Sequence, residues 1–400
     1  MAPEGWIKTT LTSLIDIKHG FAFKSENFTD SGHYILMTPG HFHEEGGFRS
    51  QGQKTKYYVG EIPSSYVLKK GDVVVAMTEQ AAGLLGSTAF VPENEKYLHN
   101  QRLGLIKPRD KSKVDINFIY WLYNSKEIRK QISEQASGTK VKHTSPERLT
   151  TVVTLLPPMI EQKKISEILH TWDQAINATA RLIRNSQRQK KALMQLLLTR
   201  QKRLPGFEEN WSEFRLGTLF KERVETETQG LPLLSITSDD GVINRESVGR
   251  KDTSNTDKSK YLRICIRDIG YNTMRMWQGV SGLSHFEGIV SPAYTVLTPQ
   301  AGVDPLYASY LFKLPSMIHL FYRHSQGMVS DTWNLKYSNF SKIKWTFPNI
   351  NEQKAIATVL ATADNEIEAL QQKLFCLKQE KNALMQQLLT GKRRVKVKAA

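Results

Sequence analysis

The chain has 400 residues, a length that predicts roughly two or three domains. Its 55 lysines and arginines exceed its 39 aspartates and glutamates, and a formal net charge of +16 points to a polyanionic partner such as nucleic acid. Two cysteines far apart in sequence exclude a disulfide framework and a cysteine-based zinc site. The N-terminus lacks the apolar core of a signal peptide, and no apolar run is long enough to cross a bilayer, so we expect a cytoplasmic protein without a membrane partner.

Residues 1–156 are expected to form a first, β-rich domain. The runs Tyr66–Leu68 and Val73–Met77, separated by a Lys-Lys-Gly-Asp turn, predict two strands joined by a hairpin. Residues 115–132 carry apolar side chains at helical spacing and predict a helix.

Residues 157–203 are expected to form a long helix and a linker. Pro157 and Pro158 mark the start of the helix, and the polar stretch 200–210, with its Pro-Gly break, follows its end. A helix of roughly 40 residues is about 60 Å long.

Residues 204–347 predict a second domain on the same plan as the first. The runs 289–290 and 294–297 resemble strands, and residues 304–322 have helical spacing. The openings of the two domains align weakly, with Trp211 in the place of Trp6. Residues 348–400 then predict a second long helix, which ends at Gly391, and a basic tail.

The two helical segments are copies of one element. Residues 157–199 and 348–390 align without a gap, with 18 identities in 43 positions. Apolar residues recur at alternating spacings of four and three, which is the seam pattern of a coiled coil. The first seam is more polar in its middle, so its natural partner is the other copy. The residues assigned to the seam are Ile165, Leu169, Trp172, Ile176, Ile183, Leu193, Leu197, Ile356, Leu360, Ile367, Leu370, Leu374, Leu384 and Leu388.

If a pseudo-twofold axis relates the copies, the helices run antiparallel, with a midpoint near Arg181 and Gln372. This register predicts three seam contacts: Ile183 with Leu370, Thr179 with Leu374, and Leu197 with Ile356.

A lysine occupies the same seam position in both copies, as Lys190 and Lys381. The register brings Lys190 to Ala363 and Lys381 to Trp172, whose ring is suited to a cation–π contact. The alternative is that both lysines turn outward and contact a partner subunit.

Motifs for catalysis are missing from the sequence. There is no P-loop and no dinucleotide fingerprint after a strand. The Pro-Pro of residues 156–159 lacks the flanking polar and aromatic residues of a DNA amino-methyltransferase. His41 and His43 are better explained as a surface loop pair than as metal ligands. We therefore predict no catalytic residue and no metal site.

Basic side chains interleaved with aromatic and amide groups are the candidate DNA contacts. Lysine and arginine suit phosphate contacts, whereas arginine, glutamine and asparagine also match base edges. For any single member a solvated surface charge is the ordinary alternative. The candidates are Lys54, Lys56, Tyr57, Tyr58, Arg102, Lys140 and Lys142 in the first domain, and Arg250, Lys251, Lys258, Lys260, Arg275 and Gln278 in the second.

Both long segments open with Pro-x-x-x-Glu-Gln-Lys-x-Ile and close with Ala-Leu-Met-Gln-x-Leu-Leu-Thr. With two diverged domains, this pattern resembles the specificity subunit of type I restriction–modification enzymes, which act in phage defence. The resemblance places six residues in conserved helix openings and residues 192–199 and 383–390 in conserved closings. The opening residues are Glu161, Gln162, Lys163, Glu352, Gln353 and Lys354.

The resemblance implies an α+β fold with a pseudo-twofold internal repeat: two target recognition domains and an antiparallel coiled coil. It implies a non-catalytic subunit that binds no cofactor and reads a bipartite, asymmetric sequence in double-stranded DNA. It further implies recruitment of two methyltransferase (modification) subunits, which bind S-adenosylmethionine and methylate adenine. The sequence does not decide whether two restriction subunits join them.

Two other functions stay open at this point. An enzyme with its own nuclease or methyltransferase activity is disfavoured by the missing motifs. A coiled-coil interaction protein without specific DNA readout is disfavoured by the net charge and by the two β-rich domains.

Overall fold

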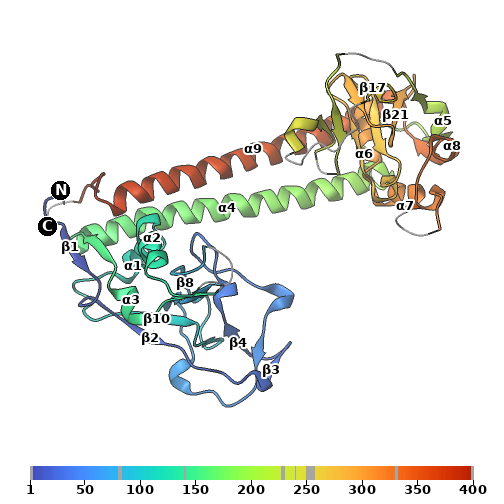
Figure 1. The fold of residues 1–400 in the computed structure, drawn as a ribbon. Coiled ribbons are helices and arrows are strands. Elements are labelled where there is room, and N and C mark those ends of the chain that lie inside the picture. Colours follow the sequence, from blue (N-terminus) through green and yellow to red (C-terminus); the bar gives the residue numbers. More distant parts are fainter. Residues whose placement is uncertain are drawn as a thin grey trace. The chain divides into compact units, whose positions relative to one another are not determined.

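A computed structural model describes residues 3–79, 83–138, 141–226, 230–238, 240–248, 257–328 and 332–397. The chain divides into two compact units, the first made of Met1–Thr179 and Lys373–Ala400 and the second of Ala180–Gln372. Each unit contains one β-rich domain and part of each long helix, α4 (Met159–Leu198) and α9 (Ile350–Leu389), which Figure 1 labels. The predicted α+β class is confirmed.

The helices α4 and α9 pack against each other in antiparallel orientation within each unit. In the first unit, Asp173 of α4 pairs with Lys381 of α9; in the second, Ser186 bonds Glu366 and Lys190 bonds Asp364. As residue numbers rise along α4, those of its partners fall along α9. The division between the units follows Thr179 and Gln372, close to the predicted seam midpoint.

The first domain contains two four-stranded sheets, of order β2-β10-β6-β8 and β3-β5-β4-β9, and the strand pairs β1-β12 and β7-β11. Its strands are β1 (Ile7–Thr10), β2 (Ile15–His19), β3 (Phe28–Thr29), β4 (Tyr34–Met37), β5 (Tyr57–Tyr58), β6 (Val73–Ala76), β7 (Thr78–Glu79), β8 (Thr88–Phe90), β9 (Tyr97–His99), β10 (Leu103–Pro108), β11 (Lys142–His143) and β12 (Val153–Leu156). Its helices are α1 (Ile116–Tyr123), α2 (Lys126–Glu134) and α3 (Pro146–Thr150).

The second domain has one four-stranded sheet, β14-β21-β18-β19, and the pairs β13-β22, β15-β16 and β17-β20. Its strands are β13 (Ser212–Arg215), β14 (Phe220–Arg223), β15 (Leu234–Ile236), β16 (Val242–Asn244), β17 (Leu262–Ile264), β18 (Ile269–Asn272), β19 (Ser281–Leu283), β20 (Gly288–Val290), β21 (Tyr294–Pro299) and β22 (Lys344–Phe347). Its helices are α5 (Leu216–Leu219), α6 (Pro305–Leu311), α7 (Pro315–His324) and α8 (Tyr337–Phe340).

The two domains repeat one plan down to strand register. The first strand pairs antiparallel with the last in each, so Ile7 lies opposite Leu156 and Ser212 lies opposite Phe347. The sheet β2-β10-β6-β8 has its counterpart in β14-β21-β18-β19. This agreement supports the expectation that the variable segments are two diverged copies of one fold.

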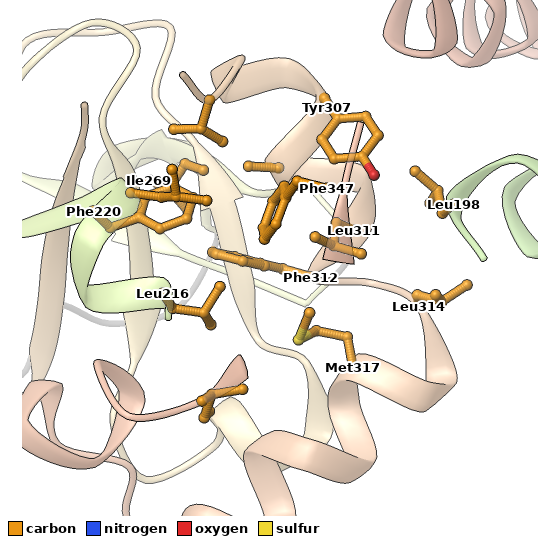
Figure 2. Packing of buried hydrophobic residues seen from close by; sticks show 14 of the residues in the cluster. Leu198, Leu216, Phe220, Ile269, Tyr307, Leu311, Phe312, Leu314, Met317 and Phe347 are labelled. Atoms are coloured by element: carbon orange, nitrogen blue, oxygen red, sulfur yellow. The ribbon is translucent and has the colours of Figure 1, made fainter. Parts of the chain in front are cut away.

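Each domain shares a hydrophobic core with the long helices of its own unit. In the first unit, Phe118 and Ile128 of α1 and α2 cluster with Ile165 of α4 and Leu388 of α9. In the second, the cluster includes Leu198 of α4 together with buried domain side chains, among them Leu311, Leu314 and Met317 (Figure 2).

Three local predictions need correction. Residues 115–132 form two helices. The first ends at Tyr123, and the Ser125 hydroxyl accepts from the Ile128 N–H and so caps the N-terminus of α2. Residues 304–322 are likewise divided, with Pro315 starting α7, since proline lacks the N–H that a continuous helix needs. The predicted strand at residues 66–68 is also absent, and Ser64–Tyr66 form a 3-10 turn; β6, β20 and β21 confirm the other strands named above.

Among the described helices, none has an apolar stretch long enough to cross a membrane. The predicted domain limits at 156/157 and 347/348 fall where β12 and β22 lead into α4 and α9.

Candidate nucleic-acid interface

A buried glutamine fastens each domain to the start of a long helix. The Oε1 of Gln162 accepts from the Asp115 N–H at 2.9 Å, and its Nε2 donates to the carbonyls of Lys113 and Pro157 at 3.0 and 2.9 Å. Asp115 in turn caps α1 by accepting from the N–H of Phe118. One fully buried side chain therefore links the helix opening to the domain.

The second unit repeats this joint. Gln353 accepts from the Asp304 N–H at 2.9 Å and donates to the carbonyls of Gly302 and Pro348 at 3.0 and 2.9 Å. Asp304 caps α6 through the N–H of Tyr307. The Glu-Gln-Lys motif is thus explained by its second residue, which satisfies three backbone groups in both copies.

The glutamate of the motif binds an indole and a guanidinium. The carboxylate of Glu161 accepts from Trp6 Nε1 at 3.2 Å and from Arg394 Nε at 2.9 Å, and Arg394 Nη2 completes the pair. The ion pair with Glu161 raises the pKa of Arg394. Lys163, the third residue of the motif, is exposed, as is Lys354 in the second copy.

The seam lysines form ion pairs inside the units. Lys381 lies 2.5 Å from Asp173, and its ammonium stands 4.8 Å from the centre of the Trp121 ring. The prediction that Lys381 makes a cation–π contact with Trp172 is therefore wrong, although its ion-pair partner, Asp173, is the residue that follows Trp172. Trp121 belongs to α1, so the lysine joins helix and domain.

Lys190 repeats this arrangement in the second unit. It lies 2.5 Å from Asp364, the neighbour of the predicted Ala363, and 5.1 Å from the centre of the Tyr310 ring. The Tyr310 hydroxyl donates to Asp364 at 2.7 Å. Both pairs lie one residue from the predicted register, and both lysines contact their own chain.

The residues assigned to the seam lie in the packed part of the helix pair. Eight are buried: Ile165, Leu169, Ile183, Leu197, Ile356, Leu360, Ile367 and Leu388. Six are half-buried: Trp172, Ile176, Leu193, Leu370, Leu374 and Leu384.

The DNA candidates of the first domain are not equally accessible. Lys54 and Arg102 are exposed. Lys56 is exposed too, but it forms an ion pair with Asp30 at 2.5 Å. Tyr58 is 4% exposed, and its ring packs edge-on against Phe23, so burial removes it from the accessible surface.

Lys142 lies on β11, opposite Glu79 of β7, and its Nζ donates to the Ser133 hydroxyl at 3.2 Å. Tyr57 is half-buried on β5. Lys140 lies outside the described residues.

In the second domain the candidates separate into two groups. Lys258 stands 4.8 Å from the centre of the Tyr261 ring, with Lys260 exposed nearby in sequence. Arg275 and Gln278 are exposed around the 3-10 turn Met276–Gln278. Arg250 and Lys251 lie outside the described residues.

Sequence reasoning missed an aromatic cluster beside Arg275. Trp277, Tyr322 and Trp333 come from three segments, and the ring centre of Trp333 lies 5.1 Å from that of Trp277 and 4.9 Å from that of Tyr322. Trp277 lies between the candidates Arg275 and Gln278 in the sequence, whereas the other two rings are brought there by the fold.

His41 and His43 do not form a surface pair. His41 is buried, its Nδ1 accepts from the Thr38 N–H at 3.1 Å, and burial lowers its pKa to about 4. His43 remains exposed. No group of three or more metal-ligating side chains occurs among the described residues.

Comparison with known proteins places the chain in a family. The model of the type I restriction modification DNA specificity domain matches residues 3–185 and 208–379. The putative type I restriction enzyme MjaX specificity subunit of Methanocaldococcus jannaschii is 24% identical over 364 residues, covering 83% of this chain and 81% of that protein. The EcoBI specificity subunit of Escherichia coli is 28% identical over 178 residues, which are 44% of this chain and only 34% of the relative.

Solved structures share the fold. The S subunit of a type I restriction-modification system from M. genitalium gives a TM-score of 0.61 at 16% identity, covering 97% of this chain and 99% of that one. A chain from a structure describing complex assembly and conformational transition of the type I system gives 0.58 at 17% identity, covering 98% and 100%. The chain therefore belongs to the type I restriction–modification DNA specificity family, and it is a specificity subunit, the non-catalytic component of such a system.

Proposed function

We propose that this subunit reads a bipartite, asymmetric target in double-stranded DNA, with one half-site for each domain. The observation that carries the proposal is a repeated fold with unlike exposed side chains. The two domains agree in strand register, yet β7, which follows β6, pairs with the strand that carries Lys142 and the exposed His143, whereas the segment after β18 carries Arg275 and Trp277. Equal frames with different surfaces suit two different base sequences.

In this proposal the two long helices connect the two recognition domains. Each helix is 40 residues long, or about 60 Å at 1.5 Å per residue. The ion pairs of Lys381 and Lys190 specify their register, since a slip of one turn would separate each lysine from its aspartate.

The DNA-contacting residues proposed for this function are Lys54, Arg102, Lys260, Arg275 and Gln278, which are exposed, together with Lys140 and Lys142 of the segment that leads into β11. The lysines and arginines among them suit phosphate, the amide of Gln278 suits a base edge, and the net charge of +16 favours DNA approach.

In this proposal the subunit assembles in the cytoplasm with two modification subunits, which bind S-adenosylmethionine and methylate adenine. Restriction subunits would join the same complex. This chain recognises the DNA target sequence, and its partner subunits catalyse the reaction.

The test is methylome sequencing of a host that expresses the modification subunit with and without this chain. We expect one bipartite, non-palindromic motif that depends on the chain. Exchanging residues 1–156 for the corresponding domain of another family member should change one half of the motif, and exchanging residues 204–347 should change the other. A palindromic motif, or methylation that does not depend on the chain, would refute the proposal.

A further inference from the structure

Three aromatic rings meet on the second domain outside its hydrophobic clusters. Trp277 follows β18, Tyr322 lies on α7, and Trp333 lies between α7 and α8. Trp277 and Trp333 meet edge to face with centres 5.1 Å apart, and Tyr322 stands 4.9 Å from Trp333. Tyr322 is 42% exposed and both indoles are half-buried, so the cluster reaches the surface. Such a grouping on a soluble domain indicates a contact site.

The backbone holds these rings in place. Trp277 Nε1 donates to the carbonyl of Met274 at 2.9 Å. The segment that carries Trp333 is closed by two hydrogen bonds of 2.8 Å, in which Gln326 and Asn334 each donate an N–H to the other's carbonyl. Leu335 then donates its N–H to the carbonyl of Thr273. Rings fixed before binding lose little entropy when a partner arrives.

The surroundings of the cluster are basic and polar. Arg275 and Gln278 flank Trp277, and Arg323 follows Tyr322; all three are exposed. The described residues of these segments, 273–278, 315–328 and 332–336, contain no carboxylate, and Asp331 lies outside the described residues. An apolar centre with a cationic rim matches DNA, whose phosphates bind the cations while base edges offer apolar contacts.

The first domain has the same structural position with different chemistry. There the two-way bond joins Ser137 and His143, and Thr144 donates its N–H to Met77, as Leu335 does to Thr273. The side chains that reach the surface at this place are polar, namely Lys142 and His143 of β11, whereas Glu79 on the adjacent strand is buried. The two domains therefore share this position in the fold but carry different side chains there, so it is a place where they can recognise different half-sites.

We propose that Trp277, Tyr322 and Trp333 form the base-contacting surface for the second half-site, where they touch apolar base edges such as the thymine methyl group. The proposal rests on the proposed function and deepens it. Arg275 and Gln278 position the DNA and contact phosphate or base edges beside the rings. Aromatic contacts release no counterions, so this surface supplies sequence discrimination rather than salt-dependent affinity.

The test uses the full chain assembled with its modification subunits and three duplexes: the methylome-derived target, and the same target with either the first or the second half-site scrambled. For Trp333→Ala we expect the preference for the target over the second-half-scrambled duplex to fall about tenfold or more, the scale of a lost base contact. The preference over the first-half-scrambled duplex and the slope of affinity against salt should stay unchanged. Phe286→Ala is the matched control, because Phe286 is 50% exposed on the same domain outside the cluster.

Folding is checked by thermal unfolding, and Tyr322→Ser removes an exposed ring should Trp333→Ala fail to fold. Equal discrimination by wild type and by a folded variant would overturn the inference while leaving the proposed function intact. A wild-type complex that prefers neither half-site would instead sink the proposed function. Loss of preference at both half-sites would also overturn the inference, because the cluster would then act through the whole fold.

Discussion

Arg203 donates two hydrogen bonds to the carboxylate of Glu352, from Nε at 3.0 Å and from Nη2 at 2.6 Å. Arg203 follows α4, whereas Glu352 lies in the first turn of α9, so the pair fastens the end of one helix to the start of the other within the second unit. Trp211, at the start of the second domain, donates its Nε1 to the same carboxylate at 3.2 Å. The Glu352 side chain is only 1% exposed, and its carboxylate accepts hydrogen bonds from these three donor groups.

The first prediction concerns this joint. Trp211→Phe keeps the ring but removes the N–H donor, and a hydrogen bond to a charged group contributes about 1.5–3 kcal/mol. We expect the free energy of unfolding of the second unit to fall by that amount in urea denaturation.

The matched control is Trp6→Phe, which removes the equivalent donor to Glu161. It should destabilise the first unit alone, as followed by hydrogen exchange of α1. A Trp211→Phe chain as stable as wild type would show that the indole contributes only by packing.

The repeated helices were predictable because their evidence is periodic and local. A gapless alignment at an offset of 191 and a four-three apolar spacing fix the antiparallel register to within one residue of the observed Asp173–Lys381 and Lys190–Asp364 pairs. The break at Ser125 was missed because the apolar spacing of α1 continues across it into α2.

Contacts between distant segments could not be predicted from one sequence. Trp121 and Lys381 are 260 residues apart, and nothing in their spacing announces a cation–π contact. The same holds for the aromatic cluster, whose members meet only because the loop carrying Trp333 is tied to Thr273. Local composition marks Tyr58 as a DNA candidate but does not reveal that its side chain is buried.

The second prediction concerns the seam lysine. Lys381→Met leaves Asp173 half-buried beside an apolar side chain, and the helix pair of the first unit should lose stability. Replacing both partners, in Lys381→Met with Asp173→Leu, should restore most of the loss, since no unpaired charge remains.

A double-mutant cycle on urea unfolding measures the coupling, which we expect at about 0.5–3 kcal/mol. Glu368→Gln is a suitable control, because Glu368 is an exposed carboxylate on the same helix. Additive effects of the two substitutions would mean that the ion pair contributes no net stability.

The third prediction concerns the salt dependence of DNA binding by the assembled complex. Each lysine that neutralises a phosphate contributes close to one to the slope of log affinity against log salt. Lys140→Ala with Lys142→Ala should therefore reduce that slope by about two, while sequence preference stays the same.

Anisotropy titrations at several salt concentrations give the slope. Lys130→Ala is the control, as an exposed lysine on α2 that pairs with Glu134 at 3.8 Å. If the double variant keeps the wild-type slope, this loop does not contact phosphate.

The fourth prediction concerns pH and His99. This side chain is fully buried in the first domain, its Nε2 donates to the Leu103 carbonyl at 2.9 Å, and burial lowers its pKa to about 4. Lys18, His19 and Lys107 add to that shift, since nearby positive charge disfavours the imidazolium.

Because the folded-state pKa lies below the unfolded value of 6.5, the neutral form stabilises the fold above pH 6.5 and its contribution is lost as pH falls toward 4. At about 1.4 kcal/mol per pKa unit, His99 accounts for about 3 kcal/mol across that window. His99→Gln keeps an amide donor for the Leu103 carbonyl but cannot titrate, so its Tm should fall less steeply between pH 6.5 and 4. His319→Gln, at an exposed position of the second domain, should leave the wild-type profile unchanged. A His99→Gln chain that destabilises with the full wild-type slope would show that other groups, such as buried His41, govern the acid response.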